Sequence, residues 1–249
     1  MKCRMLLHLL LCVILLTSAA TVRAQYPYDY EDPFDAGWPG TDWDHTLNSG
    51  TWGVVDDGGD YYVTGTGPHC SAHCAYSHAI DPFHIMFGEN DSEQAEWGYD
   101  FRIPSASEDI SFAVILGTPG DWTLGVYVIM KTCNPSSFTK VASSGGYEEN
   151  LAAPPLARDV WYTLKILYAY ENEEMSLRIQ IAERDGGLPF YDVSPTGLDL
   201  VGFGPLDAIT IAAESTSVHH FDNVFLRSTI PPVPTENATW GEVKSLYSR

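Results

Sequence analysis

The stretch that decides the fold reads Trp161-Tyr-Thr-Leu-Lys-Ile-Leu-Tyr-Ala-Tyr170. Tyr162 and every second residue after it are apolar or aromatic, and this period of two is typical of a strand with one buried face. The segment from Met175 to Glu183 repeats the alternation, and the polar residues 171–174 between the two segments can turn the chain. The pattern predicts a β-hairpin.

Short alternating segments of this kind occupy most of the chain, separated by clusters of Gly, Pro, Asn and Asp. Helical periodicity is confined to the C-terminal end. The sequence is therefore predicted to be all-β, and its strands suit a two-sheet antiparallel jelly-roll sandwich. The expected strands are 51–56, 61–65, 96–103, 110–117, 122–132, 138–142, 161–170, 175–183, 198–203, 208–213 and 218–227.

The N-terminal residues 1–24 are predicted to be a secretory signal peptide. Lys2 and Arg4 precede an apolar run from Met5 to Leu16, and small residues lead to Ala24, near which cleavage is expected. A transmembrane anchor is the alternative, but the run is shorter than the roughly 20 residues that a bilayer requires. We therefore expect a protein that is secreted, or held at the cell surface or in the periplasm, with no membrane span.

The proline run 231–234 is predicted to end the sandwich domain, which would cover residues 25–229. Residues 230–249 would then form a Pro-rich linker and a short C-terminal helical tail. Thr239 and Glu242 have the spacing of a helix capping box. Since so short a helix is marginal in water, the tail is expected to be frayed or docked on something. We expect it to be detachable from the sandwich and to serve a partner of the cell surface or the secretion machinery, with docking onto the sandwich edge as the alternative.

Charge limits the possible partners. The chain has 33 acidic and 13 basic residues, a formal net charge of −20. Such a surface repels nucleic acid and anionic membranes, whereas it tolerates cations and neutral ligands. Nucleic acid is therefore not expected as a partner.

Four segments resemble, in order and spacing, the concanavalin A-like lectin/glucanase superfamily and its laminin G-like modules. They are Asp32-Pro-Phe-Asp35, Ser49-Gly-Thr-Trp-Gly-Val-Val-Asp-Asp-Gly58, Trp161-Tyr-Thr-Leu-Lys-Ile166 and Phe221-Asp-Asn-Val224. The resemblance implies a jelly-roll sandwich. It does not by itself imply one activity, because the motifs are structural.

Enzymes of this superfamily that are similar to family 16 glycoside hydrolases carry a Glu-x-Asp-x-(x)-Glu cluster on one strand. This chain lacks the cluster, so we expect a secreted, non-catalytic lectin-like or adhesion domain that binds carbohydrate or a cell-surface glycan. Two alternatives stay open: a glycan-cleaving hydrolase or lyase with an unrecognised site, and a purely structural envelope or extracellular interaction protein.

The predicted ligand-binding residues are Trp38, Asp42, Trp43 and Asp44, in the loop from Gly37 to His45. Sugars present flat apolar faces ringed with hydroxyls, so their sites combine aromatic platforms with a few polar groups. Trp52, Trp97 and Trp161 lie in strand motifs and are predicted to be core residues.

Sandwiches that resemble this one hold a structural calcium ion, and the resemblance implies Asp222 as a ligand together with Asp32 and Gly59. Oxygen ligands from segments far apart in sequence would tie the first strand to the last. The alternative is that Asp222 accepts hydrogen bonds from neighbouring backbone amides.

Three cysteines follow the predicted signal peptide: Cys70, Cys74 and Cys133. An exported chain favours a disulfide, with Cys70 or Cys74 bonded to Cys133, although an odd number cannot all pair within one chain. A soft-metal site with the nearby histidines and free thiols are the alternatives.

Overall fold

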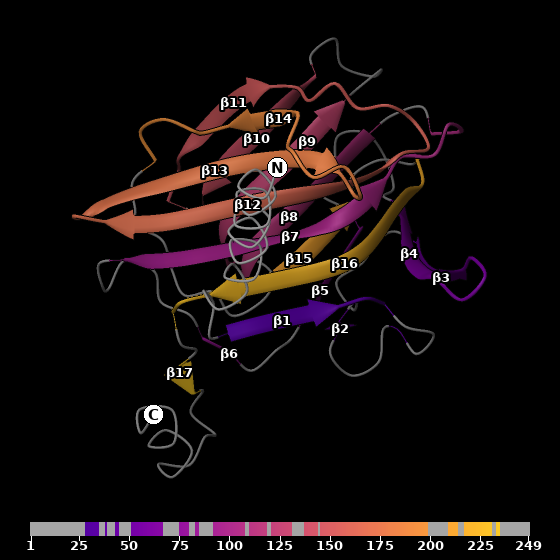
Figure 1. Cartoon of the computed structure of the whole chain (residues 1–249), viewed down its shortest axis with the longest axis horizontal. Helices are drawn as coiled ribbons and strands as arrows, with labels where there is room; N and C mark the ends of the chain where they lie inside the picture. The colour runs from indigo at the N-terminus through magenta and orange to yellow at the C-terminus, as the bar shows by residue number, and fades with distance from the viewer. Residues whose placement is uncertain are drawn as a thin grey trace, which may run out of the picture.

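The computed structural model describes residues 28–34, 38, 43–44, 51–66, 75–79, 83–84, 92–107, 110–118, 121–130, 137–143, 145–198, 209–213, 217–230 and 233–234. These residues form two large antiparallel sheets, one behind the other in Figure 1, and a small two-stranded ribbon. The predicted all-β jelly-roll sandwich is confirmed.

The first sheet, called sheet A, has eight strands. Its order is β14 (Tyr191–Val193), β13 (Glu174–Glu183), β12 (Trp161–Glu171), β7 (Glu93–Arg102), β16 (His219–Ser228), β4 (Tyr61–Thr66) and β3 (Thr51–Asp56), and β1 (Tyr28–Asp32) also pairs with β16. The pairing of β1 with β16 brings the beginning and the end of the sandwich together.

The second sheet, sheet B, has seven strands. Its order is β11 (Glu148–Ala152), β10 (Phe138–Ser143), β9 (Asp121–Met130), β8 (Ile110–Thr118), β15 (Ile209–Ala213), β5 (Ala75–Ala79) and β2 (Trp43–Asp44). The ribbon pairs β6 (Phe83–His84) with β17 (Val233–Pro234).

The predicted hairpin is confirmed as β12 and β13, paired from Tyr162 opposite Glu183 to Glu171 opposite Glu174. The two residues of its turn, Asn172 and Glu173, have φ of 54° and 65°. Left-handed backbone at both central positions is typical of the two-residue turns whose twist matches that of a hairpin.

The core lies between the inner faces of the two sheets. Alternate residues of β12 and β13 face it, as the sequence pattern predicts. The largest fully buried side chains are Trp97, Tyr99, Tyr168, Phe34, Phe101, Phe221, Ile103 and Leu124. Trp97 is thus a core residue as predicted, while Trp52 is half-buried and packs against the core.

Most of the predicted strands are present, with bounds that differ by three residues or fewer. The segment 198–203 is different: Leu198 is not in a strand, and the rest of the segment lies outside the described residues. The strands that the sequence reading missed are β1, β2, β5, β6, β11, β14 and β17. Each has five residues or fewer, which is too short for alternation to be distinguished from chance.

Within the described residues, the predicted linker contributes one short strand, in which Val233 and Pro234 lie opposite His84 and Phe83. Proline is compatible with so short a ribbon, which needs few backbone donors. The signal peptide and the C-terminal tail lie outside the described residues and stay predictions. Within the described part, no helix is long and apolar enough to cross a membrane.

Candidate functional site

The predicted ligand-binding tryptophans lie at the edge of the sandwich. Trp43 is 4% exposed and Trp38 is half-buried. Their ring centroids are 6.1 Å apart, and both rings contact Phe34. The structure therefore places both indoles in an aromatic cluster against the core. The Asp42 and Asp44 side chains lie outside the described part of the chain, so a binding role for this loop stays a prediction.

Asp32 joins the two sheets at this edge. One carboxylate oxygen accepts a hydrogen bond of 2.8 Å from the Phe34 amide, and the other accepts one from the indole N–H of Trp43. Because β1 belongs to sheet A and β2 to sheet B, this side chain bridges the sandwich. Both carboxylate oxygens of Asp32 therefore accept hydrogen bonds from the protein.

The predicted calcium ligands lie on β1, on β16 and in the turn after β3. Asp32 lies opposite the buried Val224 and so faces inward, whereas Asp222 faces outward, and the Gly59 amide donates to Asp56. Among the residues that the structure describes, no three His, Cys, Asp or Glu side chains form a group that could hold a metal ion. A site built from the Asp222 carboxylate and backbone carbonyls near Asp32 and Gly59 stays a prediction, and no part of the proposed function depends on it.

Asp222 instead accepts a 2.8 Å hydrogen bond from the Asn223 amide, which agrees with the alternative reading of this residue. The predicted disulfide cysteines, Cys70, Cys74 and Cys133, lie outside the described residues, and their pairing stays a prediction.

The outer face of sheet A carries an ion network that sequence reasoning did not find. Arg184 bridges two carboxylates: its Nε lies 3.0 Å from Asp100 Oδ2 and its Nη2 lies 2.7 Å from Asp222 Oδ2. Thr163 and Asn223 each donate a further hydrogen bond to Asp100. We call these five residues the Arg184 network.

A β-bulge builds this network. The register between β16 and β7 shifts after Asp222, which lies opposite Asp100, and resumes at Phe225. Asn223 within the bulge has φ of 46°, a left-handed conformation that asparagine tolerates better than most residues. The bulge lets both Asp222 and Asn223 reach the polar side of the sheet.

Burial controls the electrostatics of the network. Desolvation raises the pKa of Asp222 to about 6 against the lowering effect of Arg184. Desolvation also raises the pKa of Asp100, although hydrogen bonds from Asn223 and Thr163 oppose it. Both residues are nearly inaccessible, with Asp100 6% and Asp222 1% exposed, and both carboxylates are ion-paired with Arg184. The network therefore acts as a structural clamp between β7, β16 and the end of β13.

Beside this network lies a second group, here called the Trp161 cluster: Trp161, Arg102, His220 and Tyr62. Trp161 and His220 both lie opposite Arg102 in the sheet register. The Arg102 guanidinium carbon is 4.9 Å from the Trp161 ring centroid and 5.1 Å from that of Tyr62. Tyr62 and His220 contact each other at 4.6 Å between centroids. Four strands thus supply one aromatic and cationic group, in which Tyr62 is buried and Trp161, Arg102 and His220 are half-buried.

The predicted core position of Trp161 is wrong, because the side chain is half-buried on the outer face. The signal that could have placed it was the alternation itself. Tyr162 is 3% exposed and faces the core, so its neighbour in the same strand must face the other way.

Hydrogen bonding in the Trp161 cluster uses few of its polar atoms. Arg102 Nε donates to His220 Nδ1 at 3.1 Å. Within the described residues, no hydrogen bond is made by the Trp161 indole N–H, the Tyr62 hydroxyl or the terminal amino groups of Arg102. Among the described residues, these polar groups lie next to aromatic rings and have no hydrogen-bond partner.

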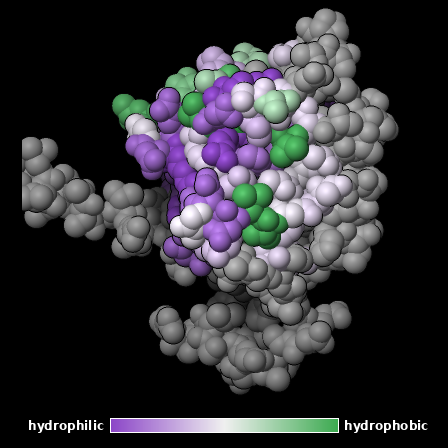
Figure 2. Space-filling model, turned by 90° about the vertical axis from the view of Figure 1, so that its right-hand side faces the viewer, coloured by the Kyte–Doolittle hydropathy of each residue, from purple (hydrophilic) through white to green (hydrophobic). Residues whose placement is uncertain are grey.

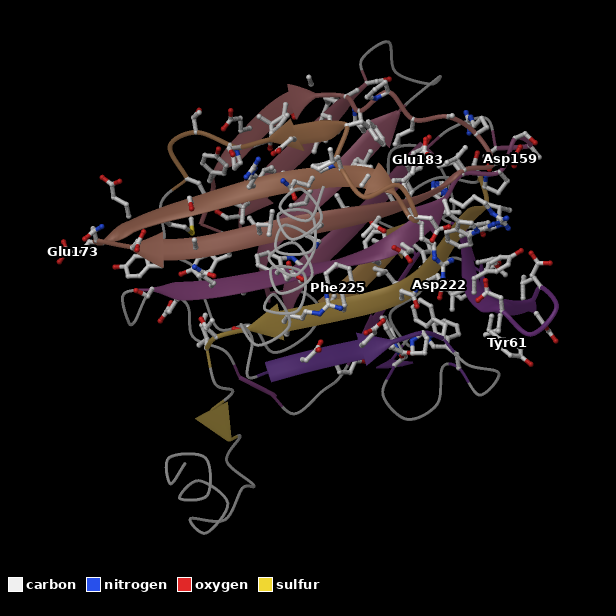
Figure 3. All side chains as sticks on the ribbon, viewed as in Figure 1. Tyr61, Asp159, Glu173, Glu183, Asp222 and Phe225 are labelled. Atoms are coloured by element: carbon white, nitrogen blue, oxygen red, sulfur yellow. The ribbon has the colours of Figure 1, made fainter. Side chains whose placement is uncertain are left out.

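Both groups lie at one end of the sandwich. Figure 3 shows Tyr61, Asp159, Glu183 and Asp222 at this end, and Glu173 of the hairpin turn at the opposite end. The described surface there is mostly hydrophilic, with small separate hydrophobic patches, as Figure 2 shows. The site is thus a polar surface with local aromatic character.

Acid should weaken the fold partly through His219, which is 1% exposed. Burial lowers its pKa from 6.5 to about 3. Between pH 6.5 and about pH 3, the unfolded chain binds a proton at this histidine that the native state does not bind. The contribution of His219 to stability is therefore present above pH 6.5 and is lost as pH falls, by about 1.4 kcal/mol per pH unit. The pKa of Asp222 is raised, so the contribution of this residue to stability changes with pH in the opposite direction. We therefore expect the free-energy cost of His219→Asn, measured by urea unfolding, to shrink as pH falls from about 6.5 to about 4.5. A constant cost would contradict the buried neutral imidazole.

No protein-family model matches the chain, and no curated protein matches it in sequence. Solved structures do match. Peanut lectin with a nine-residue peptide is 9% identical, with a TM-score of 0.53 over 84% of this chain and 99% of that one. Lectin I from Ulex europaeus, in complex with the methyl glycoside of α-L-fucose, is 13% identical, with a TM-score of 0.52 over 81% and 98%.

A further match is the exoplasmic/lumenal domain of VIP36 in a Ca2+/Man-bound form, 11% identical with a TM-score of 0.47 over 85% of this chain and 98% of that one. At such identities the peanut and Ulex matches establish the fold alone. The chain has the lectin-like, concanavalin A-like fold, and the resemblance read from its motifs is confirmed at that level.

Proposed function

We propose that this concanavalin A-like sandwich is a secreted, non-catalytic lectin-like domain that binds carbohydrate through the Trp161 cluster. The observation that carries the proposal is the half-buried Trp161 ring on the outer face of sheet A, with the guanidinium carbons of Arg102 and Arg184 lying 4.9 Å and 5.2 Å from its centroid. The fold supports it, since similar structures include a lectin in complex with a fucose glycoside.

The chemistry of the cluster suits a sugar. Aromatic rings pack against the C–H faces of a pyranose, and amino, indole and hydroxyl groups bind its hydroxyls. The rings contact one another across strands, with Trp161 and Tyr62 at 5.6 Å between centroids. A site on paired strands pays little conformational entropy on binding, because its side chains are already ordered.

The non-catalytic part of the proposal is supported by the state of the two carboxylates of the Arg184 network. Glycoside hydrolysis needs one carboxyl group to act as an acid and a second to act as nucleophile or base. Asp100 and Asp222 are buried and joined through Arg184, an arrangement typical of a structural ion network. Secretion is supported by the apolar run and small residues before Ala24.

A glycan array followed by calorimetry tests the proposal. We expect the mature chain to bind at least one glycan class, and Trp161→Ala to weaken that binding by about tenfold or more, as for a central aromatic contact. Thermal melting of the variant checks that the sandwich stays folded.

Trp38→Ala is the matched control, since it removes an indole from the loop that the sequence pattern favours. If Trp38→Ala abolishes binding and Trp161→Ala leaves it intact, the site is the loop and the Trp161 cluster is a packing feature. If the folded mature chain binds no glycan at millimolar concentration, the proposed function is wrong.

A further inference from the structure

We propose that the Trp161 cluster selects anionic saccharides, and that Arg102 binds the carboxylate or sulfate group of the sugar. This inference rests on the proposed carbohydrate-binding function and adds the class of glycan. It also assigns a specificity-determining residue.

Arg102 differs from the other arginines whose contacts on sheet A are described. Arg178 pairs with Asp192, Arg184 pairs with Asp100 and Asp222, and Arg227 pairs with Glu96, Asp29 and Glu31. Arg102 has no carboxylate within ion-pair distance among the described residues; its contacts there are the His220 imidazole and two aromatic rings. In a chain with a net charge of −20, an arginine without a carboxylate partner is unexpected on a packed polar surface.

Asp159 is a described acidic group whose pKa is affected by the charge of Arg102. The pKa of Asp159 is lowered first by hydrogen bonds from Ser105, and the charge of Arg102 has a smaller effect. The Asp159 carboxylate accepts the Ser105 amide at 2.9 Å. Asp159 thus bonds to Ser105 and forms no ion pair with Arg102 within the described residues.

The orientation of the guanidinium is set in advance. Its central carbon lies 4.9 Å and 5.1 Å from the ring centroids of Trp161 and Tyr62, and its Nε–H donates to His220. The two terminal amino groups make no hydrogen bond within the described residues. They form one of the donor pairs with which arginine binds carboxylate, sulfate or phosphate in a bidentate manner.

The groups around Arg102 are also donors. Burial lowers the pKa of His220 to about 4, so the ring is neutral near pH 7. Because Nδ1 accepts from Arg102, the ring proton is on Nε2. The Trp161 indole N–H can only donate, and the Tyr62 hydroxyl can do so. A surface of donors around a cation matches a sugar whose acceptors include a negatively charged group.

The overall charge of the chain makes this selectivity testable. An anionic polymer is repelled by the acidic surface at long range, so non-specific adsorption is disfavoured. Any binding of an acidic glycan must then come from contacts at short range.

Binding of matched polysaccharides by the full mature chain tests the inference. The probes are dextran, dextran sulfate and polygalacturonate, together with polygalacturonate whose carboxylates have been methyl-esterified. We expect at least one acidic polymer to bind about tenfold or more tightly than its neutral counterpart. Comparison of dextran sulfate with polygalacturonate shows whether the site accepts a sulfate or a carboxylate.

Three variants locate the selectivity. Arg102→Ala should remove the preference for the acidic polymer, and Arg102→Lys should keep only part of it, because an ammonium group has the charge without the paired donors. Arg178→Ala is the control, since it removes an exposed arginine that is already paired with Asp192 on the same sheet. It should leave the preference unchanged.

Equal binding of acidic and neutral polymers by the wild-type chain would overturn the inference and leave the proposed function standing. Absence of binding to every glycan, on these polymers and on the array, would overturn both. The wild-type comparison needs no variant, so the inference stays open to refutation even if Arg102→Ala fails to fold. Unchanged selectivity in a folded Arg102→Ala protein would remove the role of Arg102.

Discussion

Gly98→Ala is expected to destroy the stable fold, because a Cβ at this position would lie 1.9 Å from the backbone oxygen of Leu164. Gly98 is in the middle of β7, opposite Lys165 of β12. Backbone atoms of a central strand cannot move aside without breaking the ladder. We expect a loss of about 4 kcal/mol or more, which is most of the stability of many domains, measured by urea unfolding and soluble yield.

Gly53→Ala is the control for this substitution. Gly53 also lies within a strand of sheet A, β3, but a Cβ there would be 3.7 Å from Thr64 Oγ1, an ordinary contact. Its effect should stay within about 1 kcal/mol. A Gly98→Ala protein that unfolds at nearly the same urea concentration as the wild type would show that β7 and β12 do not approach so closely.

Arg184→Ala is expected to have the second large effect, because it leaves Asp100 and Asp222 buried without their cation. Breaking a buried ion network by removing one partner costs about 3–5 kcal/mol. The exposed pair of Arg178 with Asp192 has the same chemistry, and Arg178→Ala should cost much less, because water screens an exposed pair. Urea unfolding of the two variants near neutral pH compares the two sites.

The Arg184→Ala loss should also depend on pH. Burial already raises the pKa of Asp222 from 3.8 to about 6, and removal of Arg184 raises it further. A raised native pKa contributes stability that is fully present below the unfolded value of 3.8 and is lost as pH rises through the native value. The loss should therefore be larger near pH 7 than near pH 5. Equal losses for both arginines, or a loss independent of pH, would contradict the clamp.

The contrast between the two arginines explains why burial rather than ion-pair geometry makes the Arg184 network important. Asp192 and Arg178 are accessible to water, which screens their attraction, and their side chains are 30% and 56% exposed. Asp222 is 2% exposed at its side chain. Without Arg184, water could not replace the lost cation.

Alternation along single strands was enough to predict the all-β class, the hairpin of β12 and β13 and the buried face of each. This succeeds because the direction of a side chain in a strand depends on its position in that strand alone. The same rule implies that Trp161 faces outward, although its place in a strand motif had led to a predicted core position. Short edge strands such as β14 were missed because three residues contain too little pattern.

The composition of the candidate site could not be predicted in this way. Arg102, Trp161 and His220 meet because β12 and β16 are both neighbours of β7 and because their registers align at one row. Strand order and register are set by packing between residues far apart in the chain, and a slip of one residue would turn each side chain to the other face. No local pattern contains that information.

The sequence by itself determined the fold class and its resemblance to lectin-like sandwiches, since both depend on local periodicity and on motifs that are contiguous in the chain. The tertiary structure alone decided that Asp222 would face Asp100 and Arg184, and that Asp32 would bridge the sheets to Trp43. The reason is physical: a bulge at Asn223 and the pairing of the first strand with the last determine which carboxylates are buried and which donors reach them.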